Sequence, residues 1–399
     1  MENQCTPTYS TLWNKGFLAL ITADLLLCVS CYMSIPFLPH TLAQVHADST
    51  PHAAVAIIAF AVGMFASGCF CSWLIQRFRR NTVFLVSALL FGLLQVGFLS
   101  LEESVLPIPK HLFTALLYCT LFIAGAAFGL AKRTLSCTLL IDKAESHHRT
   151  EANQLAATMS RLAIAVGPLL FFFLRDSIAP WWRHTLCIAL IIMTLLLVLT
   201  QKFPFRAPED DTKVISTDRF FLPQGWKVFV DISCTTLSFG IIMPLQTNAS
   251  FYIFLLLGFF FSLGLQHYLS ASSGKRSFII GDLLVLTASA MLVFPLSHYS
   301  FTFIAALILG VGLGTACSCQ LSRLLCLCNH CQRSTAVSTY FLACDGGFFL
   351  GLALSFLFPL EPQQAAIAIT ALCCIAIIAS TKGKNPTETS KQKDNDNRL

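Results

Sequence analysis

Twelve long apolar stretches constrain this chain more than any other feature of its sequence. Each is long enough to cross about 30 Å of hydrocarbon as a helix, which takes roughly 20 residues. A membrane β-strand would be about ten residues long with alternating polarity, so we predict an all-α membrane protein with twelve spans. The stretches lie near residues 16–38, 52–75, 81–100, 111–131, 151–174, 181–202, 225–245, 250–270, 277–296, 300–321, 335–358 and 363–381.

The composition agrees with this class. Hydrophobic residues make up 55% of the 399 residues and charged residues 12%, about half the charge of a soluble domain. The net charge of +6 has an explanation in membrane topology, so no nucleic-acid partner is expected. The 17 cysteines are scattered through apolar spans, and we interpret most of them as small hydrophobic residues.

The positions of lysine and arginine predict the orientation. If the N-terminus is inside, almost all of the 26 basic residues fall in inside segments. The exceptions are Lys110, Arg175 and Arg183 in outside segments and Arg161 within a span. Basic residues accumulate on the cytoplasmic side of membrane proteins, so both termini are predicted to lie inside. We expect a multi-pass protein of the bacterial inner (cytoplasmic) membrane.

The chain is expected to consist of two six-helix bundles related by pseudo-symmetry. Residues 204–224 form the longest polar interruption and are interpreted as a cytoplasmic linker. This divides the chain into an N-terminal bundle (1–203) and a C-terminal bundle (225–381). The charged tail, 382–399, is expected to be disordered and cytoplasmic.

One stretch occurs in both halves. Residues 149–168 align with 333–351 without a gap, which places Arg161 opposite Asp345. Gly125 and Gly129 precede the first copy much as Gly310 and Gly314 precede the second. Small residues let helices approach closely. The expected helix-packing residues are Gly125, Gly129, Gly167, Pro168, Gly346, Gly347 and Gly351.

Arg161 is the strongest candidate for a functional residue, because an ionisable group inside a membrane normally faces a wet cavity or a partner. Its functional interpretation is that it holds an anionic group or tunes a nearby carboxylate; the alternative is a structural ion pair. Asp24 and Asp345 are the expected counter-charges and candidate proton carriers. An Asp-Gly-Gly turn that merely loosens the helix is an equal alternative for Asp345.

Other polar residues receive weaker assignments. Lys132 and Arg133 are interpreted as snorkelling to the headgroups. The second possibility is that the helix continues to Asp142, so that these two cations line the inner mouth. Asp231 and Asp282 are expected to be solvated at the interface. Gln95 and Gln320 are candidate cavity-lining residues, and the basic turn that anchors topology or gates the inward face contains Arg77, Arg79 and Arg80.

The sequence offers little for a cofactor or for catalysis. Cys326, Cys328, His330 and Cys331 lie within a cysteine-rich segment, Cys317 to Cys331, but their spacing lacks the paired Cys-x-x-Cys of common zinc sites. We therefore predict no metal site and no cofactor. Arg276 stands where a P-loop needs Ser or Thr, which argues against ATP-driven pumping. No enzyme motif is recognisable.

Several segments resemble the major facilitator superfamily. They are SIPFLPHTL at the end of the first span, SWLIQRFRRNTVFL (72–85), GAAFGL with the later RTEA, and RSTAVSTYFLACDGGFFLG. The last segment is similar to the sequence pattern at span 11 in the drug and metabolite efflux branch of this family. Ser72, Gln76 and Arg79 depart from the signature of the second segment, which weakens the charge relay that it implies. Leu121 stands where many proton-coupled exporters have an arginine.

The resemblance implies a secondary active transporter that works by alternating access. The expected function is proton-coupled export of a drug or metabolite. The alternatives are proton-coupled uptake of an organic anion and a transport-inactive sensor or scaffold with the same fold. The expected partners are a small-molecule substrate, protons and the lipid bilayer, and the protein is expected to be monomeric.

Overall fold

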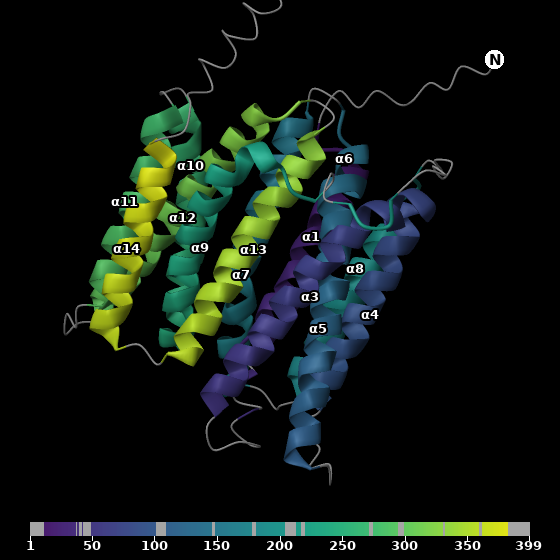
Figure 1. Cartoon of the computed structure of the whole chain (residues 1–399), viewed down its shortest axis with the longest axis horizontal. Helices are drawn as coiled ribbons and strands as arrows, with labels where there is room; N and C mark the ends of the chain where they lie inside the picture. The colour runs from purple at the N-terminus through teal and green to yellow at the C-terminus, as the bar shows by residue number, and fades with distance from the viewer. Residues whose placement is uncertain are drawn as a thin grey trace, which may run out of the picture.

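The computed structural model describes residues 12–36, 38–39, 42, 49–100, 109–145, 148–177, 181–203, 213–216, 220–270, 274–293, 299–329, 332–358 and 361–381. Within these ranges the chain is helical, and each predicted span corresponds to one long helix (Figure 1). The long helices are α1 (Lys15–Ser34), α3 (Ser49–Arg77), α4 (Arg80–Ser100), α5 (Lys110–Thr134), α7 (Arg149–Ser177), α8 (Trp181–Leu199), α9 (Trp226–Ile242), α10 (Ala249–Ser270), α11 (Gly274–Val293), α12 (Tyr299–Leu327), α13 (Arg333–Leu357) and α14 (Pro362–Thr381).

Nine of the helices in the described ranges are long and apolar enough to cross a membrane. The remaining three have shorter apolar segments, at Thr185–Leu199, Ile279–Leu292 and Ile367–Ile378. The structure therefore agrees with a multi-pass membrane protein, and the count of twelve spans stays a prediction.

The first six long helices pack together, as do the last six, and the two groups use the same contacts. In the N-terminal bundle α1 packs on α7 and α8, α3 on α5, and α4 on α5 and α8. In the C-terminal bundle the corresponding pairs are α9 with α13 and α14, α10 with α12, and α11 with α12 and α14. The purple-to-blue helices and the green-to-yellow helices accordingly occupy opposite sides of Figure 1.

The bundles meet along two equivalent helix pairs. Helix α3 packs on α13, and α7 packs on α10. By their contacts, α3 corresponds to α10 and α7 corresponds to α13. A rotation that superposes one bundle on the other therefore converts the α3–α13 pair into the α10–α7 pair. This is the arrangement expected of parallel repeats related by an axis along the membrane normal. The boundaries of the bundles, at residues 203 and 225, stay a prediction.

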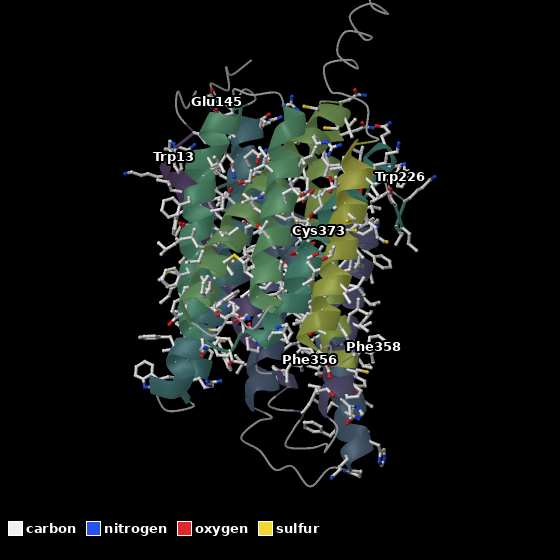
Figure 2. All side chains as sticks on the ribbon, turned by 90° about the vertical axis from the view of Figure 1, so that its left-hand side faces the viewer. Trp13, Glu145, Trp226, Phe356, Phe358 and Cys373 are labelled. Atoms are coloured by element: carbon white, nitrogen blue, oxygen red, sulfur yellow. The ribbon has the colours of Figure 1, made fainter. Side chains whose placement is uncertain are left out.

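Polar contacts gather the predicted inside segments at one end of the molecule. The side-chain amide nitrogen of Asn14 donates to the carbonyl oxygen of Lys143 at 3.1 Å, and Lys143 Nζ donates to that of Lys202 at 2.9 Å. Trp13, Glu145 and Trp226 lie towards this end in Figure 2, whereas Phe356 and Phe358 lie towards the other. The predicted inside segments therefore lie at the same end of the molecule, as the predicted topology requires. Which end faces the cytoplasm stays a prediction.

Helix α5 does not end at its two basic residues. A π-helix, Leu135–Leu139, and the short α6, Leu140–Asp142, continue it without a break, so that the apolar helix runs for 33 residues. Lys132 is 1% exposed and Arg133 5%. The preferred interpretation of both as snorkelling residues is therefore wrong. Of the second possibility, the continuation of the helix to Asp142 is confirmed, whereas lining of the inner mouth by these two buried cations stays a prediction. π-helical turns are rare and often mark functional sites.

The predicted packing glycines lie where helix backbones touch. A Cβ atom at Gly125 in α5 would overlap the carbonyl oxygen of Phe60 in α3, and one at Gly351 in α13 would overlap that of Leu237 in α9. Gly129, Gly167 and Gly347 also lack room for a Cβ atom, and Gly346 faces the ring of Phe65 across the bundle interface. Pro168 lies inside α7.

Candidate functional site

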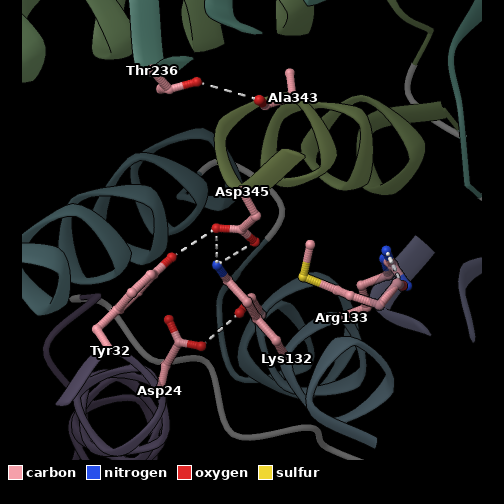
Figure 3. Close-up of polar contacts among 9 residues, drawn as sticks. Asp24, Tyr32, Lys132, Arg133, Thr236, Ala343 and Asp345 are labelled. Carbon is pink, nitrogen blue, oxygen red and sulfur yellow. Dashed lines mark hydrogen bonds and ion pairs between the residues drawn. The ribbon is translucent and has the colours of Figure 1, made fainter. Parts of the chain in front are cut away.

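A buried ion pair joins the two bundles. Lys132 Nζ in α5 lies 2.7 Å and 2.9 Å from the two carboxylate oxygens of Asp345 in α13. The hydroxyl of Tyr32 in α1 donates to Asp345 Oδ1 at 2.8 Å, as Figure 3 shows. Asp345 is 3% exposed. Its carboxylate therefore has three close donor contacts, all from the opposite bundle.

Asp24 lies on the other side of Lys132. Helix α1 is begun by Asn14, whose side chain accepts from the backbone N–H of Phe17 at 2.8 Å. This places Asp24 about 14 Å along the helix, at 1.5 Å per residue. Ser136, in the π-helix, donates to Asp24 Oδ1 at 2.6 Å. Asp24 Oδ2 is buried and has no hydrogen-bond partner among the described residues. Lys132 also acts on Asp24 electrostatically.

The three groups form a small charge network with one cation between two acids. Removing one partner of a buried ion pair typically costs about 3–5 kcal/mol, because it leaves an uncompensated charge. Asp345 and Lys132 each lie roughly 15–18 Å from the inner end of their helices, at 1.5 Å per residue. The network is thus at mid-membrane depth, where ionisable residues usually have a function.

Arg161 lies at a comparable depth in α7 but has a different set of partners. Its Nη1 donates to the hydroxyl of Tyr340 at 2.6 Å. Its Nη2 donates to Thr158 Oγ1 at 2.9 Å and to Ser318 Oγ at 2.7 Å. Arg161 is 5% exposed, and within the described ranges it has no acidic partner. The expectation that Asp345 is its counter-charge is wrong, because Asp345 pairs with Lys132 instead.

Arg161 and Asp345 nevertheless line one cavity. About 430 Å³ of space without protein atoms, part of it open to the outside, lies there between α7, α9, α10, α12 and α13. Tyr340, Phe341 and Cys344 contribute to its wall. The structure therefore brings the two central candidates of the repeat to the same cavity between the bundles, and it turns neither towards lipid. Their functional roles stay a proposal.

The two glutamines occupy different places. Gln95 lines a second, largely apolar cavity of about 560 Å³ of empty space, together with Leu121 and Phe349. Its amide accepts from Ser30 Oγ at 2.8 Å. Gln320 is buried in the C-terminal bundle, where its Nε2 donates to Thr235 Oγ1 at 3.4 Å. It belongs to neither of these two cavities.

The basic turn stays at the surface. Arg77 and Arg79 are exposed, and Arg77 lies over the ring of Trp73 at 5.9 Å. Arg80 forms an ion pair with Asp142 at 2.8 Å, with both side chains about a fifth exposed. This ties α4 to the inner end of the continued α5 helix. A pair so exposed contributes about 0–1 kcal/mol, so its main effect is to position the helix ends.

Arg133, next to Lys132, is held by α3. Its guanidinium donates to the carbonyl oxygen of Met64 at 2.9 Å and to Ser67 Oγ at 3.2 Å. The ring of Phe220, which belongs to the predicted linker, lies 5.0 Å from its Cζ. Arg133 therefore fixes α5 to α3, whereas Lys132 faces the other bundle.

Two further expectations concern residues outside this site, namely two acids of the C-terminal bundle and the cysteine-rich segment. Asp231 and Asp282 are 0% and 1% exposed, so their interpretation as solvated interface residues is wrong. Of the cysteine-rich segment, His330 and Cys331 lie outside the described residues. Within the described ranges no group of three or more His, Cys, Asp or Glu side chains is placed to hold a metal ion.

Several residues of the site have no strong signal in the sequence. Tyr32, Ser136, Ser318 and Tyr340 are common residues in apolar helices and become partners only when the helices pack. Lys132 had a usable signal, which is the apolar run that continues from it to Asp142. An uninterrupted run on both sides of a cation favours burial over an interface position.

Comparison with known proteins agrees with this arrangement. A family model described as Major Facilitator Superfamily matches residues 20–352. Among curated proteins, a search finds no match. Among solved structures, the chain is similar to the E. coli fucose:proton symporter FucP, with 14% identity, a TM-score of 0.60 and coverage of 92% of this chain and 97% of that one.

A second similar structure is a bacterial homologue of the iron transporter ferroportin in an outward-facing state. It has 12% identity, a TM-score of 0.64 and coverage of 92% of this chain and 100% of that one. At such identities the likeness shows the fold alone. The family match covers most of the sequence and points to a transporter rather than an enzyme. The chain therefore belongs to the Major Facilitator Superfamily.

Proposed function

We propose that this protein is a secondary active transporter of a small organic anion, coupled to protons and working by alternating access. One observation carries the proposal. Arg161 is buried in the cavity between the bundles, and its hydrogen-bond partners among the described residues are hydroxyl groups. The carboxylate of Asp345 lines the same cavity but is already paired with Lys132. A buried cation is costly unless an anion accompanies it. A carboxylate or phosphate of the substrate supplies that anion.

The groups around Arg161 suit an anionic group of a substrate. A guanidinium presents a planar fork that binds carboxylate or phosphate with two parallel hydrogen bonds. The hydroxyls of Tyr340 and Ser318 can turn to donate once an anion takes their place at the guanidinium. Phe239, Phe259 and Phe348 in the same cavity offer apolar surface for the rest of the molecule.

Proton coupling is assigned to the network around Lys132. A proton on Asp345 removes the ion pair that ties α13 to α5. Lys132 then keeps a counter-charge in its own bundle, because Asp24 has an unpartnered oxygen on the same side. Exchange of Lys132 between Asp345 and Asp24 therefore makes bundle separation depend on protonation. A coupling ion must interact differently with the two states, and this exchange provides such a difference.

The direction of transport rests on the resemblance of residues 333–351 to the efflux branch, which predicts export in exchange for protons. Uptake with protons is the alternative. The test is flux of a panel of carboxylates and organic phosphates in proteoliposomes with an imposed pH gradient of either sign. If the flux of these anions were the same in Arg161→Ala as in the unchanged protein, Arg161 would not be the anion-binding residue. Flux whose pH dependence is unchanged by Asp24→Asn would remove Asp24 from the coupling scheme.

A second candidate function is export of a small amphipathic compound without a negative charge. The cavity lined by Gln95, Leu121 and Phe349 favours it, because its wall is almost entirely apolar. Flux of neutral amphipathic dyes that Gln95→Leu impairs and Arg161→Ala leaves unchanged would support this candidate. Ligand-induced stabilisation without any flux would instead indicate a sensor or scaffold with the same fold.

A further inference from the structure

The cavity that holds Arg161 can compensate one negative charge of a ligand. Among the described residues that line it, Arg161 and Asp345 are the charged ones, and Lys132 contacts both carboxylate oxygens of Asp345. A proton on Asp345 does not free Lys132 for the ligand, because Asp24 is its second counter-charge. A second negative charge on the ligand would therefore be buried without compensation, which is costly in a low-dielectric interior.

The free donors of Arg161 match a carboxylate. A guanidinium carries five N–H donors. Three of those of Arg161 bond to the hydroxyls of Tyr340, Thr158 and Ser318. Two remain without an acceptor in the described part of the chain, and one carboxylate has two oxygens that can accept from them. A phosphate monoester carries about 1.5 to 2 negative charges at pH 7, so a carboxylate fits the charge of this cavity better.

The hydroxyl groups in the described lining of the cavity already have partners within the protein. Thr236 donates to a backbone oxygen of its own helix at 2.9 Å, and Ser160 shares a hydrogen bond with the thiol of Cys28. The hydroxyl of Tyr340 accepts from Arg161. A substrate rich in hydroxyl groups would lose its hydrogen bonds to water here without equal replacement. The lining thus favours a substrate that is apolar beyond its anionic group.

Phenylalanine rings from three helices form much of the remaining wall. They are Phe239 in α9, Phe259 in α10 and Phe348 in α13, and all three are buried. The rings of Phe239 and Phe348 stack, with centroids 5.7 Å apart and an angle of 26° between their planes. An aromatic ring gains more from offset or edge-to-face contact with such rings than its buried area alone provides. The wall therefore favours an aromatic body over a saturated one.

We infer that the substrate is an aromatic monocarboxylate. Arg161 is taken as the anion-binding residue, as in the proposed function on which this assignment rests. The carboxylate binds at the two remaining donors of Arg161, and the ring lies against Phe239, Phe259 and Phe348. The substrate class is thereby narrowed to one charge instead of two, a carboxylate instead of a phosphate, and a ring instead of a hydroxyl-rich or saturated body.

The test is calorimetric binding of matched probes to the purified full-length protein. The probes are phenylacetate, cyclohexylacetate, phenylmalonate, benzyl phosphate and phenylacetamide. We expect phenylacetate to bind at least about tenfold more tightly than phenylmalonate, benzyl phosphate or phenylacetamide, because each of these three leaves a buried charge uncompensated. Cyclohexylacetate keeps the carboxylate and loses the aromatic ring, so we expect it to bind about two- to tenfold more weakly than phenylacetate.

The position of the ring is tested by Phe259→Leu, which keeps a buried apolar side chain and removes one ring of the wall. Its affinity for phenylacetate is expected to fall to about that of the unchanged protein for cyclohexylacetate. The matched control is Phe98→Leu, because Phe98 and Phe259 are both 4% exposed and Phe98 lines the other cavity. The control is expected to bind phenylacetate as the unchanged protein does.

The outcomes separate this substrate class from the proposed function. If phenylmalonate or benzyl phosphate bound as tightly as phenylacetate, and Arg161→Ala lost that binding, the aromatic monocarboxylate would be overturned and the anion site would stand. Equal affinity for cyclohexylacetate, or an equal loss in Phe98→Leu and Phe259→Leu, would also overturn it. Binding of none of these anions, or binding that Arg161→Ala leaves unchanged, would overturn both. If Phe259→Leu fails to fold, the probe series on the unchanged protein still decides the question.

Discussion

The two bundles reach across to each other through equivalent helices but with unlike chemistry. The repeat places Arg161 opposite Asp345, and each donates to or accepts from a residue near the same point of the other bundle's fourth helix. Asp345 in α13 meets Lys132 in α5, and Arg161 in α7 meets Ser318 in α12. One contact is a neutralised ion pair, and the other is a cation among hydroxyls.

This difference underlies the two roles that we propose for these contacts. The pair of Lys132 and Asp345 is compensated within the protein, so it suits a switch that a proton can open. Arg161 lacks a countercharge among the described residues, so it suits a site that an external anion completes. The two bundles thus share the positions of the crossing contacts and differ in the charges that meet there.

The largest expected effect comes from breaking the compensated contact. Lys132→Ala leaves Asp345 buried without its cation and should destabilise the protein by about 3–5 kcal/mol. The double variant Lys132→Met with Asp345→Asn removes both charges and should recover most of this loss. Thermal unfolding in detergent checks both. Equal destabilisation by the single and double variants would show that the charge pair is not the source.

The next effect concerns the uncompensated contact. Arg161→Ala should weaken anion binding by about 100-fold, since a hydrogen bond to a charged group contributes about 1.5–3 kcal/mol and a fork provides more than one. Arg161→Lys keeps the charge and should recover only part. Ligand-induced thermal shifts with carboxylates and phosphates measure it. If Arg161→Ala destabilised the ligand-free protein more than Lys132→Ala does, our assignment of the compensated and the uncompensated contact would be reversed.

A smaller effect is expected from crowding the interface beside Asp345. Gly346→Ala would push its methyl group into the ring of Phe65, and overpacking typically costs about 1–3 kcal/mol. Because the ring can partly move, we expect a destabilisation near the lower end of this range. We also expect a shift in the pH dependence of flux and an unchanged affinity for the anion. Gly97→Ala is the control, because nothing lies within 4 Å of its added atom. Lost anion affinity in Gly346→Ala would indicate that the two contacts are not separate.

The smallest effects come from the two tyrosines. Tyr32→Phe removes a donor from Asp345 but leaves both contacts with Lys132, so about 1 kcal/mol is expected. Tyr340→Phe removes the partner of Arg161 Nη1, and the guanidinium has few others. Its cost should therefore be the larger of the two in the absence of ligand and should shrink when an anion is bound. Unfolding temperatures with and without ligand compare them.

Much of the architecture was predictable because it follows from local properties of the chain. Apolar runs of about 20 residues must be helices in lipid, where each backbone polar group needs a partner within its own segment. The repeat around Arg161 and Asp345 likewise singled out two positions, and both line the cavity between the bundles.

The ion pairing was not predictable, since it depends on which helix faces fall opposite each other. Lys132 lies next to Arg133 in sequence, yet a step of one residue turns the side chain by about 100° around the helix. Lys132 therefore faces Asp345 in the other bundle, whereas Arg133 bonds to Met64 and Ser67 in its own. The prediction that Asp231 and Asp282 lie at the solvated interface was wrong for the same reason, since their burial depends on which helices pack against them.

Sequence alone determined that this chain is a bundle of membrane helices in two related halves, because hydrophobic length and charge distribution are properties that each segment carries by itself. Only the tertiary structure decided that Asp345 pairs with Lys132 and that Arg161 has hydroxyls for partners. Such pairings are settled by packing between residues some 160 to 210 positions apart, as with Ser318 and Arg161 and with Lys132 and Asp345, and at that separation a residue's type says little about what it will meet.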